Sequence, residues 1–231
     1  MPGKDKCPTK WSISTLLSKL ASEVGFKLQK SPKAYLFGNC SLRPPLRPPL
    51  EYNPSMRPSL LILSGLPFSG KSTLAKYLSE ALGVKILSYD HDIYALHKDE
   101  VLPGTSKAQE YEQIEAIARR ELKRLLQNGT SVIYDDLCLE RSDRQILVEL
   151  AHACQAKPII VFINTPTSVI RQRRKANLQL KGRDHISETK LMHDKSLLQV
   201  PDPTEDAIIY TPDQSLDELV QGIQARLLQN R

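Results

Sequence analysis

One nine-residue stretch, GLPFSGKST from Gly65 to Thr73, most constrains what this chain can fold into. It fits the pattern G-x-x-x-x-G-K-[S/T] and directly follows a short apolar run, LLILS, at residues 60–64. In this pattern the glycines let the backbone curl so that its N–H groups face phosphate oxygens, and the helix that follows points its positive N-terminal end at them. The stretch therefore predicts a strand, a phosphate-binding loop and a helix, in that order.

The residues of this loop have predicted roles. We expect all nine to bind the phosphates of a nucleotide: Gly65, Leu66, Pro67, Phe68, Ser69, Gly70, Lys71, Ser72 and Thr73. Lys71 is also a predicted catalytic residue, because its ammonium should reach the β- and γ-phosphates, and the Ser72 hydroxyl should coordinate Mg²⁺. The expected cofactors are therefore ATP and Mg²⁺.

The segments after the loop predict the fold class. Apolar runs at residues 85–89, 131–134, 158–163 and 207–210 alternate with segments whose apolar residues recur at helical spacing. Gly83 can end the first of these helices, and Ser106 with Gln109 can form a capping box for the second. Continuous apolar strands separated by helices indicate a parallel sheet covered on both faces. We expect an α/β fold, a three-layer P-loop NTPase with a mainly parallel five-stranded sheet.

The N-terminal part of the chain has a different composition. Residues 1–58 hold ten Lys and Arg against three Asp and Glu, whereas residues 59–231 hold 22 against 23. A tandem repeat, LRPPLRPPL, follows a short segment with helical spacing. Proline fixes φ and removes donors, so the repeat should be an extended linker or a docking site for a protein partner. We therefore expect a loosely ordered basic extension at 1–58 and one main domain at 59–231.

Acidic residues follow two of the predicted strands, in SYDHDIY at residues 88–94 and in SVIYDD at residues 131–136. In an open α/β sheet, ligands bind beyond the carboxyl ends of the strands, so these acids should lie on the rim that holds the phosphates. One acid must hold Mg²⁺, and in a kinase another should accept the proton of the attacking hydroxyl. Asp135 suits the metal, and Asp90 or Asp92 suits the hydroxyl.

A basic run, RQRRKANLQLKGR at residues 171–183, follows the fourth predicted strand. Arg171 and Arg174 share a helical face by their spacing of three, and Arg173 lies off it. Arginines delivered by a closing lid can neutralise the charge of a phosphoryl group in transfer and exclude water. We expect a lid at about 171–187, with Arg171 and Arg174 binding the nucleotide and Arg173 acting in catalysis.

These motifs together resemble the polynucleotide-kinase-like branch of P-loop kinases, a group that includes predicted small-molecule kinases and seryl-tRNA kinases. The resemblance covers about residues 59–210, through LILSGLPFSGKSTLAKYL, the acid after the second strand, VIYDDLCLERSDRQIL and INTPTSVIRQRR. It implies that Asp90 is the general base, Asp135 a metal or substrate ligand, and Arg173 a lid residue over the adenine or the phosphates.

Two positions depart from that family pattern. Ile93 stands where relatives often have an arginine, and Leu137 where they often have an asparagine. The substrate therefore does not carry over from polynucleotide kinases. We predict an ATP- and Mg²⁺-dependent kinase that phosphorylates a small-molecule hydroxyl. The alternatives are a kinase for a nucleic-acid or aminoacyl-tRNA hydroxyl, with the basic extension as its RNA-binding arm, and a non-catalytic nucleotide-binding regulator.

The apolar runs and the cysteines of the sequence indicate in which compartment the protein works. No apolar run approaches the roughly 18 residues needed to cross a bilayer, so we expect no membrane association. The four cysteines form no C-x-x-C pair and no ligand cluster with the histidines, which argues against a disulfide framework or a zinc site. We therefore expect a cytoplasmic protein with reduced thiols.

Overall fold

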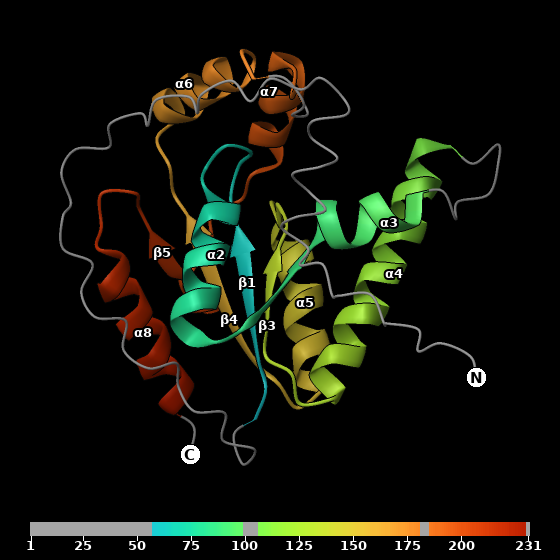
Figure 1. Cartoon of the computed structure of the whole chain (residues 1–231), viewed down its shortest axis with the longest axis vertical. Coiled ribbons are helices and arrows are strands. Elements are labelled where there is room, and N and C mark those ends of the chain that lie inside the picture. Colours follow the sequence, from blue (N-terminus) through green and yellow to red (C-terminus); the bar gives the residue numbers. More distant parts are fainter. Residues whose placement is uncertain (1–56, 99–105, 181–184, 230–231) are drawn as a thin grey trace, which may run out of the picture. The chain divides into compact units, whose positions relative to one another are not determined.

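The computed structural model describes residues 57–98, 106–180 and 185–229 (Figure 1). The predicted extension at 1–58, with its helix and proline-rich linker, lies outside the described residues except for its last two positions. Residues 181–184, in the predicted lid, also lie outside them.

Five parallel strands form one sheet, in the order β2-β3-β1-β4-β5. They are β1 (Ser59–Ser64), β2 (Lys85–Ser88), β3 (Val132–Asp135), β4 (Lys157–Ile163) and β5 (Ile208–Tyr210). The predicted parallel five-stranded α/β fold is thereby confirmed. Because β1 lies in the centre and pairs with both β3 and β4, the loop after β1 leaves the sheet in the middle of its carboxyl edge.

Helices cover both faces of this sheet. The helical elements are α2 (Lys71–Leu82), the π-helical turn η1 (Tyr89–Tyr94), α3 (Ala95–His97), α4 (Lys107–Gln127), α5 (Arg141–Ala153), α6 (Thr167–Asn177), α7 (Glu188–Leu197), the 3₁₀ turn η3 (Pro203–Glu205) and α8 (Leu216–Leu228). Helices α4 and α5 pack on one face, α2 and α8 on the other, and α6 and α7 lie beyond the carboxyl ends of the strands (Figure 1).

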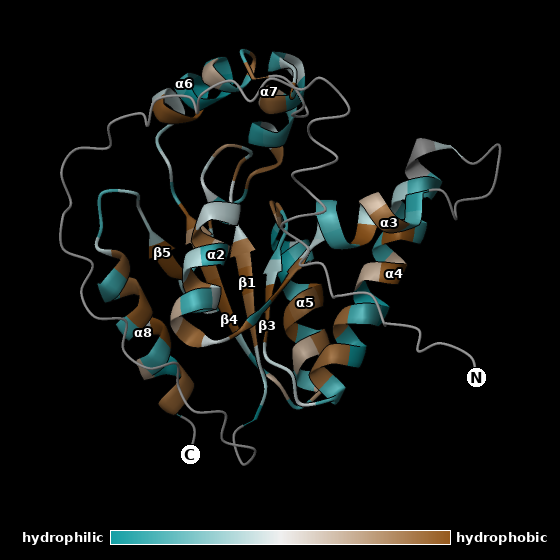
Figure 2. Ribbon diagram, in the orientation of Figure 1, coloured by the Kyte–Doolittle hydropathy of each residue, from teal (hydrophilic) through white to brown (hydrophobic). Residues whose placement is uncertain are grey.

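Strand β1 shows how the sequence produces the two cores. All six of its residues are buried, and alternate side chains point to opposite faces. Leu60 packs in the core that contains Ile114 of α4, while Leu61 packs in the core that contains Leu74 of α2. The strands accordingly form the hydrophobic centre of the molecule, and the helices expose their polar faces (Figure 2).

The predicted end of α2 and the predicted start of α4 are both confirmed. Gly83 ends α2 in the left-handed conformation, with φ of 67°, and its N–H donates to the Ser79 carbonyl. The capping box before α4 is complete: the Ser106 hydroxyl accepts from the Gln109 N–H, and the Gln109 side chain accepts from the Ser106 N–H.

A buried ion pair joins α5 to the turn η3. The Arg144 guanidinium is fully buried and donates to both carboxylate oxygens of Glu205, at 2.7 and 2.9 Å. Its remaining hydrogen bonds go to the carbonyls of Cys138 and Leu139, at 3.3 and 3.1 Å. Arg144 and Glu205 are 61 residues apart in the chain, so this one side chain ties the loop after β3 to the turn that precedes β5.

We predict that Arg144→Met lowers the free energy of unfolding by about 3–5 kcal/mol, because it leaves Glu205 buried without its partner. Urea unfolding measures the loss. The matched control is Arg141→Met, which removes an exposed pair with Asp202 and should cost less than about 1 kcal/mol. Equal losses for the two variants would contradict the prediction.

The same pair has a pH dependence with a definite sign. The hydrogen bond from Arg144 lowers the pKa of Glu205. The ion pair therefore contributes its full stability at pH values above the ordinary pKa of a glutamate, and this stability is lost as the pH falls through the lowered pKa of Glu205. The stability difference between the wild-type protein and Arg144→Met should therefore narrow in acid.

Candidate functional site

The loop between β1 and α2 requires glycine at two positions. Gly65 has φ of 151°, and a Cβ placed on it would lie 2.9 Å from the Ile163 carbonyl oxygen of β4. Gly70 has φ of 108°, in the region that favours glycine, and directly precedes α2. The Gly65 N–H donates to the Leu137 carbonyl at 3.0 Å, which fixes the start of the loop against the segment after β3.

The lysine of the motif folds back into this loop. Lys71 Nζ donates to the carbonyls of Gly65 and Leu66, at 3.0 and 2.9 Å, and the side chain is buried. Burial lowers the pKa of Lys71, and the charges of Asp135 and Asp136 act in the opposite direction. The loop thus holds a buried cation beside two carboxylates.

Two side chains hold the loop from the direction of β4 and α6. Thr165, directly after β4, donates from Oγ1 to the Ser69 carbonyl at 2.8 Å. Arg173 Nη1 donates to the carbonyls of Phe68 and Ser69, at 3.0 and 2.8 Å. The Ser69 hydroxyl itself is buried and has no hydrogen-bond partner among the described residues. A buried unpaired donor inside a curled loop fits a phosphate oxygen as its missing partner.

The other two arginines of the basic run contact α7 instead. Arg174 pairs with Glu188 at 2.7 Å and donates from Nε to the Ile186 carbonyl at 2.8 Å, and Arg171 lies 3.7 Å from the same Glu188 carboxylate. Their spacing of three places them on one helical face, as predicted, and in this structure that face points to α7. Of the three predicted arginines, the structure brings only Arg173 to the loop.

The two predicted metal ligands lie next to each other. Asp135 is the last residue of β3, is buried, and accepts a hydrogen bond from the Ser72 hydroxyl at the start of α2. Burial raises the pKa of Asp135, while the bond from Ser72 and the Lys71 charge lower it. A hydroxyl and a carboxylate beside a phosphate-binding loop are the donor set that Mg²⁺ uses with nucleotides.

The neighbouring acid, Asp136, had no role assigned from the sequence. It is partly buried and accepts from the Leu137 N–H at 2.7 Å. Burial and the charge of Asp90 raise the pKa of Asp136 to about 6, against the lowering effects of that hydrogen bond and of Lys71. In the sequence, Asp136 stands out only because it follows an apolar strand. Asp135 has the same feature, so the sequence could not tell the roles of the two acids apart.

The two acids of SYDHDIY occupy different places. Asp92 Oδ2 accepts from the Ser88 N–H at 2.9 Å, which closes the turn after β2. Asp90 is exposed, and its charge acts on Lys71, Asp135 and Asp136. Asp92 is thus held by the turn, whereas Asp90 lies near enough to Lys71, Asp135 and Asp136 for its charge to act on them.

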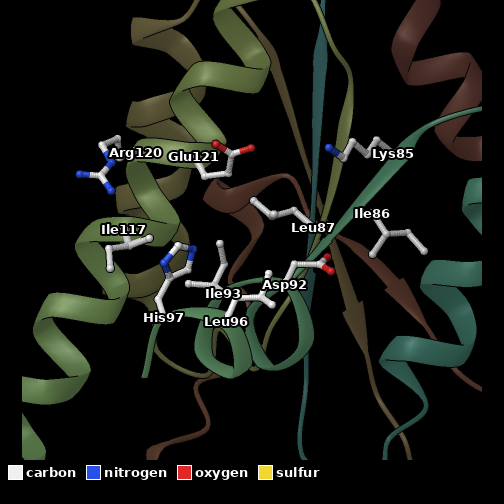
Figure 3. Close-up of a pocket in the computed structure, with 10 residues that line it drawn as sticks. All are labelled: Lys85, Ile86, Leu87, Asp92, Ile93, Leu96, His97, Ile117, Arg120 and Glu121. Atoms are coloured by element: carbon white, nitrogen blue, oxygen red, sulfur yellow. The ribbon is translucent and has the colours of Figure 1, made fainter. Parts of the chain in front are cut away.

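A pocket of about 400 Å³ adjoins Asp92 at the edge of β2 (Figure 3). Its lining residues are Lys85, Ile86, Leu87, Asp92, Ile93, Leu96, His97, Ile117, Arg120 and Glu121. None of them belongs to the phosphate loop. The pocket lies between β2, η1, α3 and α4, so it is separate from the site built around Lys71.

A family model described as an AAA domain matches residues 60–200. The chain belongs to this family. The resemblance to P-loop kinases that the motifs indicated is thereby confirmed. Among the described residues, no helix is both long and apolar enough to cross a bilayer.

Known proteins resemble the chain over different spans. It is 28% identical over 123 residues to L-seryl-tRNA(Sec) kinase of Methanococcus maripaludis, a match that spans 49% of this chain and 44% of that kinase. The chain thus covers less than half the length of this relative.

Two solved structures share the fold. Kti12 of Chaetomium thermophilum in complex with ADP-AlF3 has a TM-score of 0.60 at 17% identity, over 73% of this chain and 98% of its own. APS kinase of Mycobacterium tuberculosis in complex with AMPPNP and APS has a TM-score of 0.55 at 23% identity, over 76% and 99%. These likenesses show that the chain shares the fold of the two structures.

The raised pKa of Asp136 predicts a pH-dependent cost to stability. A carboxyl whose folded pKa of about 6 exceeds its ordinary value is destabilising once it ionises, so the cost grows as pH rises from about 4 and is complete above about 6. Asp136→Asn should therefore unfold at higher urea concentration than the wild type at pH 8, in the absence of nucleotide and metal. The advantage should shrink at pH 4, and a difference that is the same at both pH values would contradict this prediction.

Proposed function

We propose that this protein is an ATP- and Mg²⁺-dependent kinase that transfers the γ-phosphate of ATP to a hydroxyl of a small molecule. The observation that carries the proposal is the grouping of acids around Lys71. Asp135 pairs with Ser72, and Asp90 and Asp136 lie close enough for their charges to act on the same lysine. A protein that only hydrolyses its nucleotide requires the pair of Ser72 and Asp135, whereas a kinase also requires an acid that accepts the proton of the acceptor hydroxyl.

Each group of site residues has its own role in the proposed phosphate transfer. The loop N–H groups and Lys71 would hold the phosphates, and Ser72 with Asp135 would hold Mg²⁺, which would supply charge neutralisation when bound. The oxygen of the acceptor hydroxyl forms a bond to the γ-phosphorus while the bond from that phosphorus to the ADP oxygen breaks. Asp90 accepts the proton that the hydroxyl loses. Arg173, which contacts the loop, is the lid residue positioned to neutralise the transferred group.

Charge supports a small-molecule acceptor. Residues 59–231 carry 22 basic and 23 acidic residues, so the domain that holds the site has no excess of positive charge for a nucleic acid. The partial similarity to L-seryl-tRNA(Sec) kinase supports the second candidate, a kinase for an aminoacyl-tRNA hydroxyl, with the basic extension at 1–58 as its RNA-binding arm. A nucleotide-binding regulator that docks through its proline-rich repeat is the non-enzymatic alternative.

A screen with labelled ATP separates these candidates. We expect label in a small-molecule product and none in oligonucleotides with a 5′-hydroxyl, and we expect Lys71→Ala to abolish transfer because the phosphates lose their buried cation. Label in RNA would favour the second candidate. Nucleotide binding with no acceptor-dependent ADP release would favour a regulator.

The assignment of the base is tested by a matched pair of variants. Asp90→Asn should lower kcat by at least about a hundredfold, the ordinary range for loss of a general base, with little change in the affinity for ATP. Asp92→Asn keeps the shape of the turn and should retain most of the turnover. If Asp92→Asn abolishes turnover and Asp90→Asn does not, the two roles are reversed.

A further inference from the structure

The peptide group between Ser69 and Gly70 is held by its carbonyl oxygen. That one oxygen accepts from Thr165 Oγ1 at 2.8 Å and from Arg173 Nη1 at 2.8 Å. A carbonyl oxygen has two lone pairs, so these two donors fill its capacity for hydrogen bonds. The Ser69 carbonyl therefore points to the end of β4 and to α6.

The amide of the same peptide group faces the opposite way. The described peptide bonds are trans, and in a trans peptide group the N–H points away from the C=O, so the Gly70 N–H is turned away from Thr165 and Arg173. This N–H donates to no acceptor among the described residues. The Ser69 hydroxyl, which is buried and also unpaired there, lies 3.2 Å from where a Cβ on Gly65 would be. Two neighbouring donors are thus left for a phosphate oxygen.

Thr165 is fixed by the backbone on both sides of it. The Asn164 N–H donates to the Tyr210 carbonyl at 2.8 Å, which ties the end of β4 to the end of β5. Pro166 follows, and it is the N-cap residue of α6. A proline keeps the residue before it out of the helical region, so the conformation of Thr165 is restricted. The Thr165 hydroxyl therefore comes from a junction fixed by β4, β5 and α6.

The two donors to the Ser69 carbonyl differ in their freedom. Arg173 is exposed and reaches the carbonyl through a long side chain, and its charge is assigned to the phosphoryl group in the proposed transfer. Thr165 is buried, and its β-branched side chain has few rotamers. When Arg173 leaves the carbonyl for a phosphate, Thr165 still holds it.

We infer that Thr165 is a positioning residue of the phosphate site. It keeps the Ser69–Gly70 peptide group turned so that the Gly70 N–H and the Ser69 hydroxyl can bind a phosphate, whether or not Arg173 remains on the loop. Thr165 does not touch the phosphate; it acts through the Ser69 carbonyl. The inference rests on the nucleotide binding in the proposed function and is independent of the acceptor.

Calorimetric titration of the full-length protein with ATP and Mg²⁺ tests this role. Thr165→Val keeps the shape of the side chain and removes its hydroxyl, so it should raise the Kd for ATP about fivefold, the effect of one lost hydrogen bond between uncharged groups. The Kd for inorganic triphosphate should rise by the same factor, because the affected contacts are those to phosphate. Thr165→Ser keeps a hydroxyl and should restore most of the affinity.

Ser79→Ala is the matched control. It removes a hydroxyl that donates to the Val84 carbonyl at 2.7 Å, in the last turn of α2 and away from the phosphate loop. Urea unfolding should show a loss of stability in both Ser79→Ala and Thr165→Val, whereas the Kd for ATP should change only in Thr165→Val. An unchanged Kd in Thr165→Val, or a rise that Thr165→Ser shares in full, would overturn the inference.

A double variant tests whether the two donors support the same carbonyl. Because Thr165 and Arg173 share one oxygen, Thr165→Val should raise the Kd for ATP by a larger factor in the Arg173→Met protein than in the wild type. The same factor in both proteins would contradict the shared hold. A wild-type protein that binds neither ATP nor triphosphate would instead count against the proposed function itself.

Discussion

The buried guanidinium of Arg144 holds together the parts of the site that the sheet alone would leave independent. It bonds to Glu205 before β5 and to the carbonyl of Cys138 in the loop after β3. That loop in turn accepts from the Gly65 N–H through Leu137. The phosphate loop, the acid-bearing end of β3 and the last strand are therefore coupled through one buried cation whose donors are paired with acceptors, as a buried charge requires.

The same network bears backbone strain at the site. Phe68 in the phosphate loop and Cys138 after β3 have φ of 64° and 43°, which non-glycine residues seldom adopt. Both carbonyls accept from arginines, Arg173 and Arg144 respectively. Strained residues persist where surrounding bonds over-determine them, and such positions cluster at functional sites. Here they flank the two places where Lys71 and Asp135 are held.

The sequence predicts the fold well because its signals are local. The glycines of the loop, the capping box at Ser106 and the alternation along β1 each depend on near neighbours, and the sheet follows from them. The site needed information that is not local. Asp90 and Asp92 are indistinguishable by spacing, and only the bond from the Ser88 N–H to Asp92 separates them. The face shared by Arg171 and Arg174 was predictable, but its contact with Glu188 depends on how α7 packs.

The charge distribution around the loop is asymmetric, and this asymmetry has a consequence for the proposed transfer. Lys71 and Arg173 donate to carbonyls of the β1–α2 loop, whereas Asp90 follows β2 and Asp136 follows β3. The charge of Asp90 is one of the causes that raise the affinity of Asp136 for a proton. With the pKa of Asp136 at about 6, a proton taken by Asp90 from the acceptor has a second carboxylate close by that can share it. In such a site the acceptor hydroxyl would lose its proton away from the phosphates, so the leaving ADP and the departing proton would not compete for the same groups.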